Sequence, residues 1–117
     1  MNDSLLPAQA LNAQISVAPQ LAPEAMAAAA AAGFRSVINN RPDFEGGPDQ
    51  PTSAVIEAAA RAAGLQYAYL PVSGVYQTPE EIAAFKHLID TLPAPVLAFC
   101  RSGARSTKLY SQACQLG

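Results

Sequence analysis

An apolar run that ends on a cysteine is followed at once by arginines, serines and a glycine. The run reads VLAF, and the segment after it reads CRSGARS, residues 100–106. Three of the seven basic residues, Arg101, Arg105 and Lys108, fall within eight consecutive positions, and no Asp or Glu follows Asp90. The segment is therefore locally cationic in a chain of net charge -2. This pattern indicates an anion-binding site, although the solvated start of a helix would have a similar composition.

Cys100 is the candidate nucleophile of this segment. We expect a helix to begin near Ser106, so that backbone N–H groups and the positive end of the helix dipole lie close to the sulfur. Gly103 permits a backbone angle that a side chain would disfavour. A helix start, guanidinium groups and hydroxyl donors all lower the pKa of a thiol, and the thiolate is the reactive form. The alternative is a buried cysteine at a strand end with no chemical role.

The bulk composition limits the classes of function. The 117 residues, half of them hydrophobic and 14% charged, predict a single compact domain over residues 1–117. The acidic balance argues against a nucleic-acid partner. Two cysteines and one histidine give no disulfide framework and no zinc site, so we expect neither a metal nor a cofactor. The first residues do not read as a signal peptide, and no apolar run approaches the roughly 20 residues of a membrane span. These features predict a cytoplasmic protein without a membrane partner.

Strand and helix patterns alternate along the chain. We expect strands over 14–20, 34–40, 65–72 and 94–100, because these runs are apolar or β-branched and are bounded by turn residues. Pro23 opens a helix that Gly33 closes, Thr52 or Ser53 caps a helix that ends at Gly64, and a last helix runs to the end of the chain. This last helix is short for one that covers a sheet, so we expect the native chain to extend past Gly117.

The clearest helix start lies at Thr78. Thr78, Pro79 and Glu81 form a capping box with proline at the first helical position, and a stripe at helical spacing follows: Ile82, Phe85, Ile89 and Leu92. His87 lies off this stripe and is expected on a solvated face. The alternation as a whole predicts an α/β fold with three layers, a mostly parallel central sheet flanked by helices.

The carboxyl ends of parallel strands meet at one edge of a sheet, so other loops share the rim with Cys100. Arg41 and Asp43 follow the second strand, either as substrate contacts or as a local ion pair in a turn. We expect Asn39 and Asn40 to be structural, Ser73 and Tyr76 to lie on the rim, and Cys114 to be buried against the sheet.

The loop CRSGARS resembles two families of catalytic loop. It resembles the active loop of rhodanese-type sulfurtransferases and the phosphate-binding loop C-x-x-G-x-x-R of cysteine-dependent phosphatases. Upstream, GFRSVINNRPDFEG, GLQYAYLPVSG and TPEEIAAF resemble the phosphatase-like domain of bacterial beta-lactamase-hydrolase-like proteins, over nearly the whole chain. That resemblance implies a dual-specificity-phosphatase-like fold, and the family is described both as phosphatase and as sulfur transferase.

The resemblance also implies roles for the loop residues. Cys100 would be the nucleophile, Arg105 would hold the bound anion, and Ser106 would donate a hydrogen bond to the sulfur. The backbone N–H groups that would bind the anion belong to Arg101, Ser102, Gly103 and Ala104.

Three features depart from the phosphatase pattern. The second arginine comes five residues after the cysteine rather than six, where Ser106 stands, and Phe99 replaces the usual histidine before the cysteine. No carboxylate lies between Glu57 and Glu80, where a general acid is expected, so Asp43 or Glu45 would have to replace it.

These departures favour sulfur transfer, in which Cys100 becomes a persulfide and the leaving group needs no acid. A small sulfur donor and an acceptor would then be the partners, with a sulfur-oxidising enzyme fused or encoded nearby. The alternative is a protein-tyrosine or dual-specificity-like phosphatase that acts through a phosphocysteine on a phosphorylated substrate. A further alternative is a non-catalytic domain that binds an anion or another protein.

Overall fold

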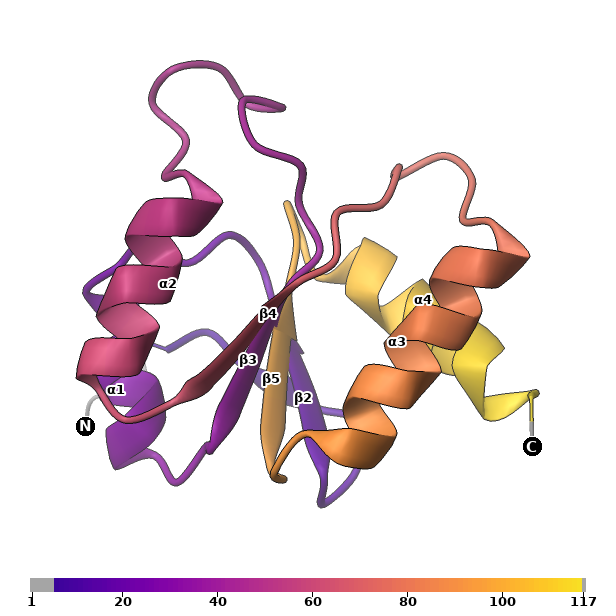
Figure 1. Ribbon diagram of the computed structural model, residues 1–117, viewed down its shortest axis with the longest axis horizontal. Coiled ribbons are helices and arrows are strands. Elements are labelled where there is room, and N and C mark those ends of the chain that lie inside the picture. Colours follow the sequence, from indigo (N-terminus) through magenta and orange to yellow (C-terminus); the bar gives the residue numbers. More distant parts are fainter. Residues whose placement is uncertain (1–5, 117) are drawn as a thin grey trace.

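The computed structural model describes residues 6–116, which form one twisted sheet covered by helices (Figure 1). The strands are β1 (Gln9–Ala10), β2 (Ile15–Ala18), β3 (Ser36–Asn39), β4 (Gln66–Tyr69) and β5 (Val96–Phe99). Their order across the sheet is β1-β2-β5-β3-β4, and every pair is parallel except β1 with β2. The strand that leads to Cys100 is therefore the middle strand of five, paired on both sides.

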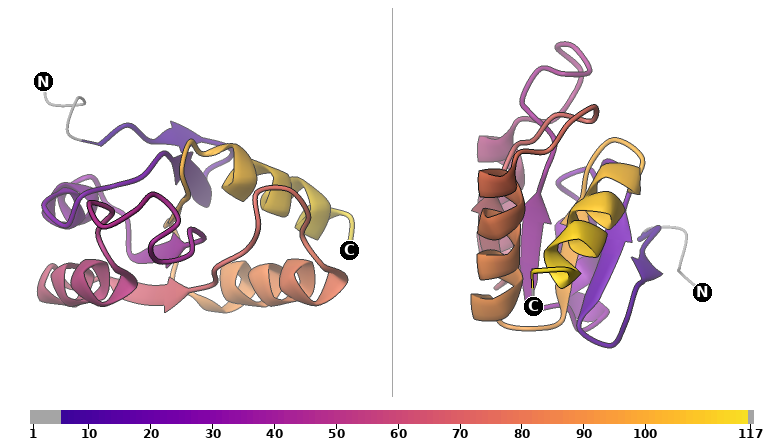
Figure 2. Two further views of the ribbon diagram at one scale, coloured as in Figure 1. Left: turned by 90° about the horizontal axis from the view of Figure 1, so that it is seen from above. Right: turned by 90° about the vertical axis from the view of Figure 1, so that its right-hand side faces the viewer.

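Four helices cover the two faces of the sheet. They are α1 (Ala25–Ala31), α2 (Ser53–Ala62), α3 (Pro79–Thr91) and α4 (Ala104–Cys114). Helices α1 and α2 lie on one face and α3 and α4 on the other, as the views of Figures 1 and 2 agree. The protein thus has the expected α/β fold with three layers and a mostly parallel sheet.

Each face of the sheet has its own hydrophobic core. On the first face, Met26 of α1 and Ile56 of α2 pack with Val37, Leu97 and Phe99 of the sheet. On the second face, Phe85 of α3 and Leu109 of α4 pack with sheet residues that include Ile38, Val96 and Ala98. Alternate residues of β3 and β5 thus point into opposite cores, as the twofold period of a strand requires. Because β5 is packed on both faces of the sheet, the position of its end, and therefore of Cys100, is fixed by the two cores.

The four expected strands and four expected helices are all present, with shifted ends. The capping box of α3 forms as expected: Thr78 Oγ1 accepts from Glu81 N at 3.1 Å and Glu81 Oε1 from Thr78 N at 2.9 Å. Helix α4 begins at Ala104, two residues earlier than the sequence suggested. Helix α1 begins after Glu24 rather than at Pro23, since a turn with Met26 N bonded to Pro23 O precedes it. The two-residue strand β1 was not predicted.

The prediction that Cys114 is buried against the sheet is wrong, because its side chain is exposed. The face of α4 that packs on the sheet consists of Ser106, Leu109 and Ala113, which are spaced three and four residues apart. Cys114 follows Ala113 by one residue and is rotated about 100° away from that face, as the 3.6-residue period dictates.

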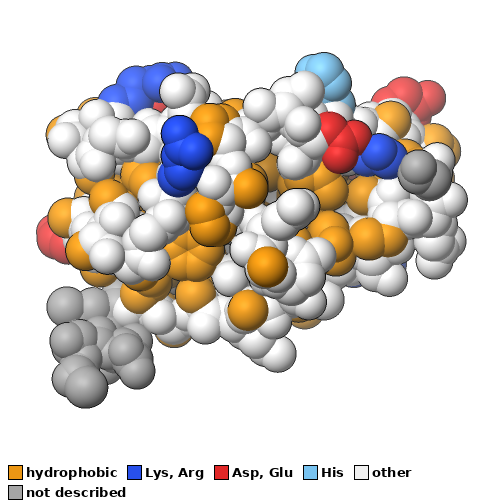
Figure 3. Space-filling view, turned by 90° about the horizontal axis from the view of Figure 1, so that it is seen from below, with side chains coloured by type: hydrophobic (Ala, Val, Ile, Leu, Met, Phe, Trp, Pro, Cys, Tyr) orange, Lys and Arg blue, Asp and Glu red, His pale blue; other side chains and the backbone are white. Residues whose placement is uncertain are grey.

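The longer loops of the protein lie at the carboxyl end of the sheet (Figure 1). The loops that follow β3 and β4 extend beyond the carboxyl end, at the top of Figure 1, next to the Cys100 loop. Figure 3 views the opposite end, where hydrophobic side chains cover much of the surface and charged ones are scattered. No helix within residues 6–116 is both long enough and apolar enough to cross a membrane.

Candidate active site

The loop of Cys100 turns sharply between the central strand and helix α4. Cys100 N donates to Ala18 O at 3.3 Å, and Gln20 N donates to Arg101 O at 3.2 Å, so the end of β2 holds both sides of the turn. Gly103 has φ +94°, a left-handed conformation that only glycine adopts readily. The glycine allows the chain to reverse and start α4 within four residues of the sulfur.

Backbone donors converge on the sulfur of Cys100. Gly103 N lies 3.1 Å from Sγ, and the N–H groups of Ser102 and Ser106 also donate to it. Burial by itself would raise the pKa of the thiol. The hydrogen bonds from Ser106, Ser102 and Gly103 outweigh burial and bring the pKa of Cys100 below its ordinary value. The expected lowering of the thiol pKa is thus present, and it comes from amide groups more than from the arginines.

Ser106 and Asn40 connect the loop to the neighbouring strand. The Ser106 hydroxyl, expected to donate to the sulfur, contacts it but donates its hydrogen bond to Asn40 Oδ1 at 2.8 Å. Asn40 in turn donates from Nδ2 to Leu70 O at 3.0 Å. A hydroxyl has one proton, so it serves the amide or the thiolate at a given moment. Asn40 is buried, and the structure links it directly to the candidate catalytic loop.

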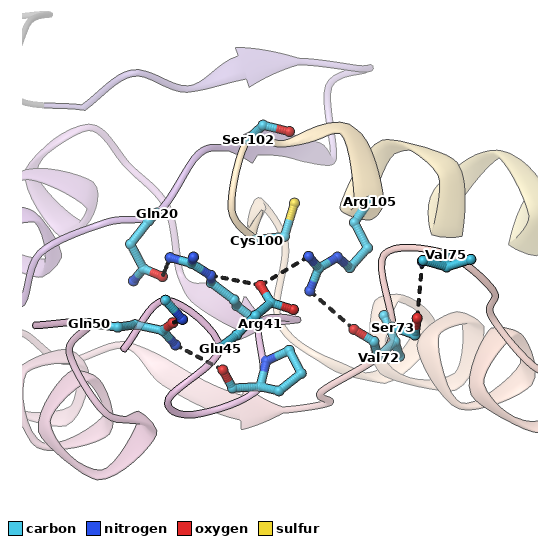
Figure 4. Close-up of polar contacts among 12 residues, drawn as sticks. Gln20, Arg41, Glu45, Gln50, Val72, Ser73, Val75, Cys100, Ser102 and Arg105 are labelled. Carbon is cyan, nitrogen blue, oxygen red and sulfur yellow. Dashed lines mark hydrogen bonds and ion pairs between the residues drawn. The ribbon is translucent and has the colours of Figure 1, made fainter. Parts of the chain in front are cut away.

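A carboxylate bridges two arginines beside Cys100 (Figure 4). Glu45 Oε1 accepts from Arg41 Nε at 2.9 Å and from Arg105 Nη2 at 3.1 Å. Arg41 also donates from Nη1 to Gln20 Oε1 at 3.2 Å. Burial would raise the pKa of the Glu45 carboxyl, but the hydrogen bonds from Arg105 and Arg41 lower it below its usual value. Glu45 is therefore ionised near neutral pH.

The guanidinium of Arg105 is nearly buried but incompletely bonded. Its side chain is 10% exposed, and Nη1 donates to Val72 O at 3.1 Å. The buried Nε has no acceptor among residues 6–116. Gly74 packs against this edge of the guanidinium, since a Cβ on it would lie 3.1 Å from Nη2 and 3.2 Å from Nε. A buried donor without a partner is costly, so an acceptor that reached Nε would be stabilised there.

An open cavity of about 760 Å³ lies over these groups. Three arginines, Arg41, Arg101 and Arg105, line it together with Glu45, Ser73 and the glycines and valine of the two rim loops, Gly46, Gly74 and Val75. Cys100 has no exposed surface and is not among the residues that line this cavity. The arrangement therefore combines a thiol of lowered pKa with an arginine-lined entrance suited to an anion.

The other predicted site residues occupy different positions. Asp43 does not face the loop: its Oδ1 accepts from Ser53 N at 2.7 Å, at the start of α2. Arg41 pairs with Glu45, not with Asp43. The Ala104 N–H, expected to face the anion, lies 3.3 Å from Ser102 Oγ.

Three further side chains stand where the sequence analysis assigned them. Ser73 lines the cavity and accepts from Val75 N at 3.0 Å, while Tyr76 is 64% exposed and His87 is exposed on α3. Within residues 6–116, no group of three or more His, Cys, Asp or Glu side chains is placed to hold a metal ion.

Sequence reasoning missed several residues that organise the site. Gln20 supports Arg41, Gln50 accepts from Gly46 N at 2.7 Å, and Gly74 adjoins Arg105. All three lie in loops that meet the carboxyl edge of the sheet. Their position in those loops was the only signal available, because polar residues and glycines are common in any loop.

Sequence comparison identifies relatives across almost the whole chain. The family described as beta-lactamase hydrolase-like protein, phosphatase-like domain, matches residues 8–116. A beta-lactamase hydrolase-like protein of Xylella fastidiosa (strain Temecula1) is 47% identical over 79 residues, which are 68% of this chain and 18% of that protein. The chain thus spans about a fifth of the length of this relative.

Solved structures share the fold. A candidate phosphatase from Neisseria meningitidis superposes with a TM-score of 0.80 and 31% identity, over 86% of this chain and 71% of that one. The core catalytic domain of the PP-IP phosphatase SIW14 from S. cerevisiae, in complex with citrate, has a TM-score of 0.62 and 11% identity, over 93% of this chain and 74% of that one. The second likeness concerns the fold alone, which is that of cysteine phosphatases.

Proposed function

Since this chain belongs to the phosphatase-like domain family of beta-lactamase hydrolase-like proteins, we propose that it hydrolyses phosphate esters with Cys100 as the nucleophile. The observation that carries the proposal is the convergence of the Ser102, Gly103 and Ser106 N–H groups on an ionisable sulfur. The unpartnered Nε of Arg105 supports it, because a phosphoryl oxygen would supply the missing acceptor.

Binding would place the phosphoryl group between the loop and Arg105. The amides at the start of α4 and the helix dipole favour negative charge at this point. Arg105 offers Nε and Nη2 on one edge of a planar fork, which matches two oxygens of a phosphoryl group. Arg41 and Arg101 line the entrance and attract the anion toward it.

The reaction would proceed in two displacements. The thiolate of Cys100 attacks phosphorus, the bond from phosphorus to the ester oxygen breaks, and the alcohol leaves as its oxyanion, which then takes a proton from solvent. Water then attacks the phosphocysteine, the phosphorus–sulfur bond breaks, and phosphate leaves while the thiolate is restored. The amides and Arg105 stabilise the charge that develops on the phosphoryl oxygens in both steps.

The leaving oxygen is the weak point of this chemistry, and it favours a second candidate function. Asp43 accepts a hydrogen bond from Ser53 N at the start of α2, away from the loop, and Glu45 is ionised by its arginine partners, so neither is placed to protonate the leaving oxygen in this state. Sulfur transfer needs no such acid. The Cys100 thiolate would attack the outer sulfur of thiosulfate, sulfite would leave as the S–S bond breaks, and an acceptor such as cyanide would take the sulfur from the persulfide.

Two assays on the same preparation test these functions. The first follows release of nitrophenol from para-nitrophenyl phosphate, whose leaving group departs without an acid. The second follows thiocyanate formed from thiosulfate and cyanide. We expect phosphate ester hydrolysis that Cys100→Ser abolishes and Cys114→Ser preserves.

Sulfur transfer without hydrolysis would assign the second function instead. Absence of both activities from the native chain, or their persistence in Cys100→Ser, would contradict catalysis at this cysteine.

A further inference from the structure

Glu45 supplies a negative charge where the proposed substrate would bring one. One carboxylate oxygen accepts hydrogen bonds from two arginines, and the Glu45 side chain is 29% exposed in the wall of the cavity. In Figure 4 the carboxylate stands between the guanidinium groups of Arg41 and Arg105, next to Cys100. A carboxylate in this position has the same charge sign and the same acceptor chemistry as an oxyanion ligand.

The hydrogen bonds of Arg105 show what a ligand would have to displace. Nη1 is held by Val72 O, Nη2 is held by Glu45, and Nε is unpartnered among residues 6–116. Nε and Nη2 form the edge with which arginine binds phosphate or carboxylate in the bidentate mode. Nη2 carries two N–H groups and Glu45 accepts from it, so an anion that uses this whole edge must share Nη2 with the carboxylate and place its negative charge beside it.

The same bridge accompanies a closed state of the thiol. Cys100 has no exposed surface, and the side chains of Arg41 and Arg105 are only 11% and 10% exposed. Side chains around the cavity must therefore move before a substrate reaches the sulfur. The Glu45 bridge ties the loop after β3 to helix α4, in addition to the hydrogen bond from Ser106 Oγ to Asn40 Oδ1, so its rupture would release the part of that loop around Glu45 from Arg105.

We propose that Glu45 is an internal competitor for the substrate, a carboxylate that occupies Arg105 until a more strongly bound anion displaces it. The inference rests on the proposed function, because it takes this cavity as the substrate site. Its consequence is selectivity: weakly binding anions do not displace Glu45, whereas a phosphate ester that engages both Nε and Nη2 does. Glu45 would thus set the affinity threshold of the site.

Phosphate binding to a protein that cannot turn over tests this competition. Inorganic phosphate is titrated by calorimetry at neutral pH into Cys100→Ser and into Cys100→Ser with Glu45→Gln. Loss of the competing charge is expected to tighten phosphate binding by about tenfold, a change that calorimetry resolves. The matched control is Glu57→Gln in the same background, because Glu57 also pairs with an arginine, Arg61, but on the exposed surface of α2. That control is expected to leave phosphate affinity unchanged.

A further variant, Gly74→Ala, tests whether phosphate binds at the Nε and Nη2 edge of Arg105. Gly74→Ala would place a methyl group against Nε and Nη2, so it is expected to weaken phosphate binding. Thermal denaturation verifies that each variant is folded, and Glu45→Ala replaces Glu45→Gln if the latter is not.

The outcomes separate the two proposals. Unchanged or weaker phosphate binding in folded Glu45 variants overturns the competitor role, and would mean that the carboxylate organises the arginines for the ligand. Phosphate that binds none of these proteins, together with a native chain that hydrolyses no phosphate ester, overturns the proposed function instead.

Discussion

Helices α3 and α4 begin in opposite ways, although both lie on the same face of the sheet. The first turn of α3 is completed by its own side chains, since Thr78 and Glu81 satisfy each other's backbone N–H groups. Helix α4 starts from Gly103 with no side-chain cap, and N–H groups at its start face the sulfur of Cys100. A helix start that caps itself contributes to stability, whereas one that does not leaves donors for chemistry.

The comparison also explains the charges around each start. Acidic residues Glu80 and Glu81 occupy the first turn of α3, where they neutralise the helix dipole. The first turn of α4 has none and includes Arg105 instead. Nothing local offsets the positive end of α4, so the compensating charge must come from the thiolate, from Glu45 or from a bound anion.

The largest expected change in activity comes from replacing Cys100, whose sulfur accepts hydrogen bonds from the start of α4. Cys100→Ser should lower the rate of phosphate ester hydrolysis at least about a thousandfold, because the nucleophile is lost. Cys114→Ser, at the other end of the same helix, should leave the rate unchanged. Steady-state kinetics of both variants measure this difference. Equal rates would mean that the missing side-chain cap of α4 does not serve catalysis at Cys100.

A smaller loss of activity is expected when Arg105, in the first turn of α4, is replaced. Arg105→Lys keeps the positive charge but loses the planar fork, so kcat/KM should fall by about a hundredfold. Arg61→Lys on α2 is the control, since Arg61 forms only an exposed ion pair. Retention of full activity in Arg105→Lys would show that charge alone suffices at this position.

Removal of the Ser106 hydroxyl should change the pH dependence of Cys100 alkylation more than it changes the alkylation rate at high pH. Ser106→Ala removes a hydroxyl that contacts the sulfur and lowers the pKa of Cys100, so that pKa should rise. Less of the thiol is then ionised at a given pH, and the acidic limb of the reaction with iodoacetamide moves to higher pH. Alkylation rates against pH, measured in a Cys114→Ser background, test this shift. An acidic limb that stays in place would mean that the backbone N–H groups alone hold the thiolate.

The smallest expected effect lies at the self-capped helix. Thr78→Ala removes the cap of α3 and should lower the free energy of unfolding by about 1 kcal/mol, without changing kcat/KM. Urea denaturation and the hydrolysis assay measure the two quantities. A loss of activity at unchanged stability would contradict the conclusion that the start of α3 serves stability and the start of α4 serves function.

Most of the fold could be predicted because local signals and tertiary packing agree. Pro79 and Thr78 mark the start of α3, Gly33 and Gly64 follow helix ends with positive φ, and apolar or β-branched runs mark the four longer strands. Strand β1 lacked such a signal. It is two residues long and exposed, and it exists because Gln9 and Ala10 pair with Val17 and Ser16.

The candidate site could be predicted only in part. Cys100, Gly103 and Arg105 are adjacent in sequence, so the loop was evident without the structure. The role of the loop after β3 was not, because Asp43 and Glu45 look alike in the sequence. Phe44, with φ +67°, turns the chain between them, so that one carboxylate meets α2 and the other meets Arg105.

The central place of β5 has a consequence for how the site moves. All four of its residues pair with both β2 and β3, so amide hydrogens of Val96–Phe99 should exchange with solvent only when the whole protein unfolds. The loop that carries Glu45 lies outside the sheet and can open without that cost. Cys100 is thus anchored to the strand expected to exchange most slowly, while Glu45, which we propose controls access to the site, belongs to a loop outside the sheet.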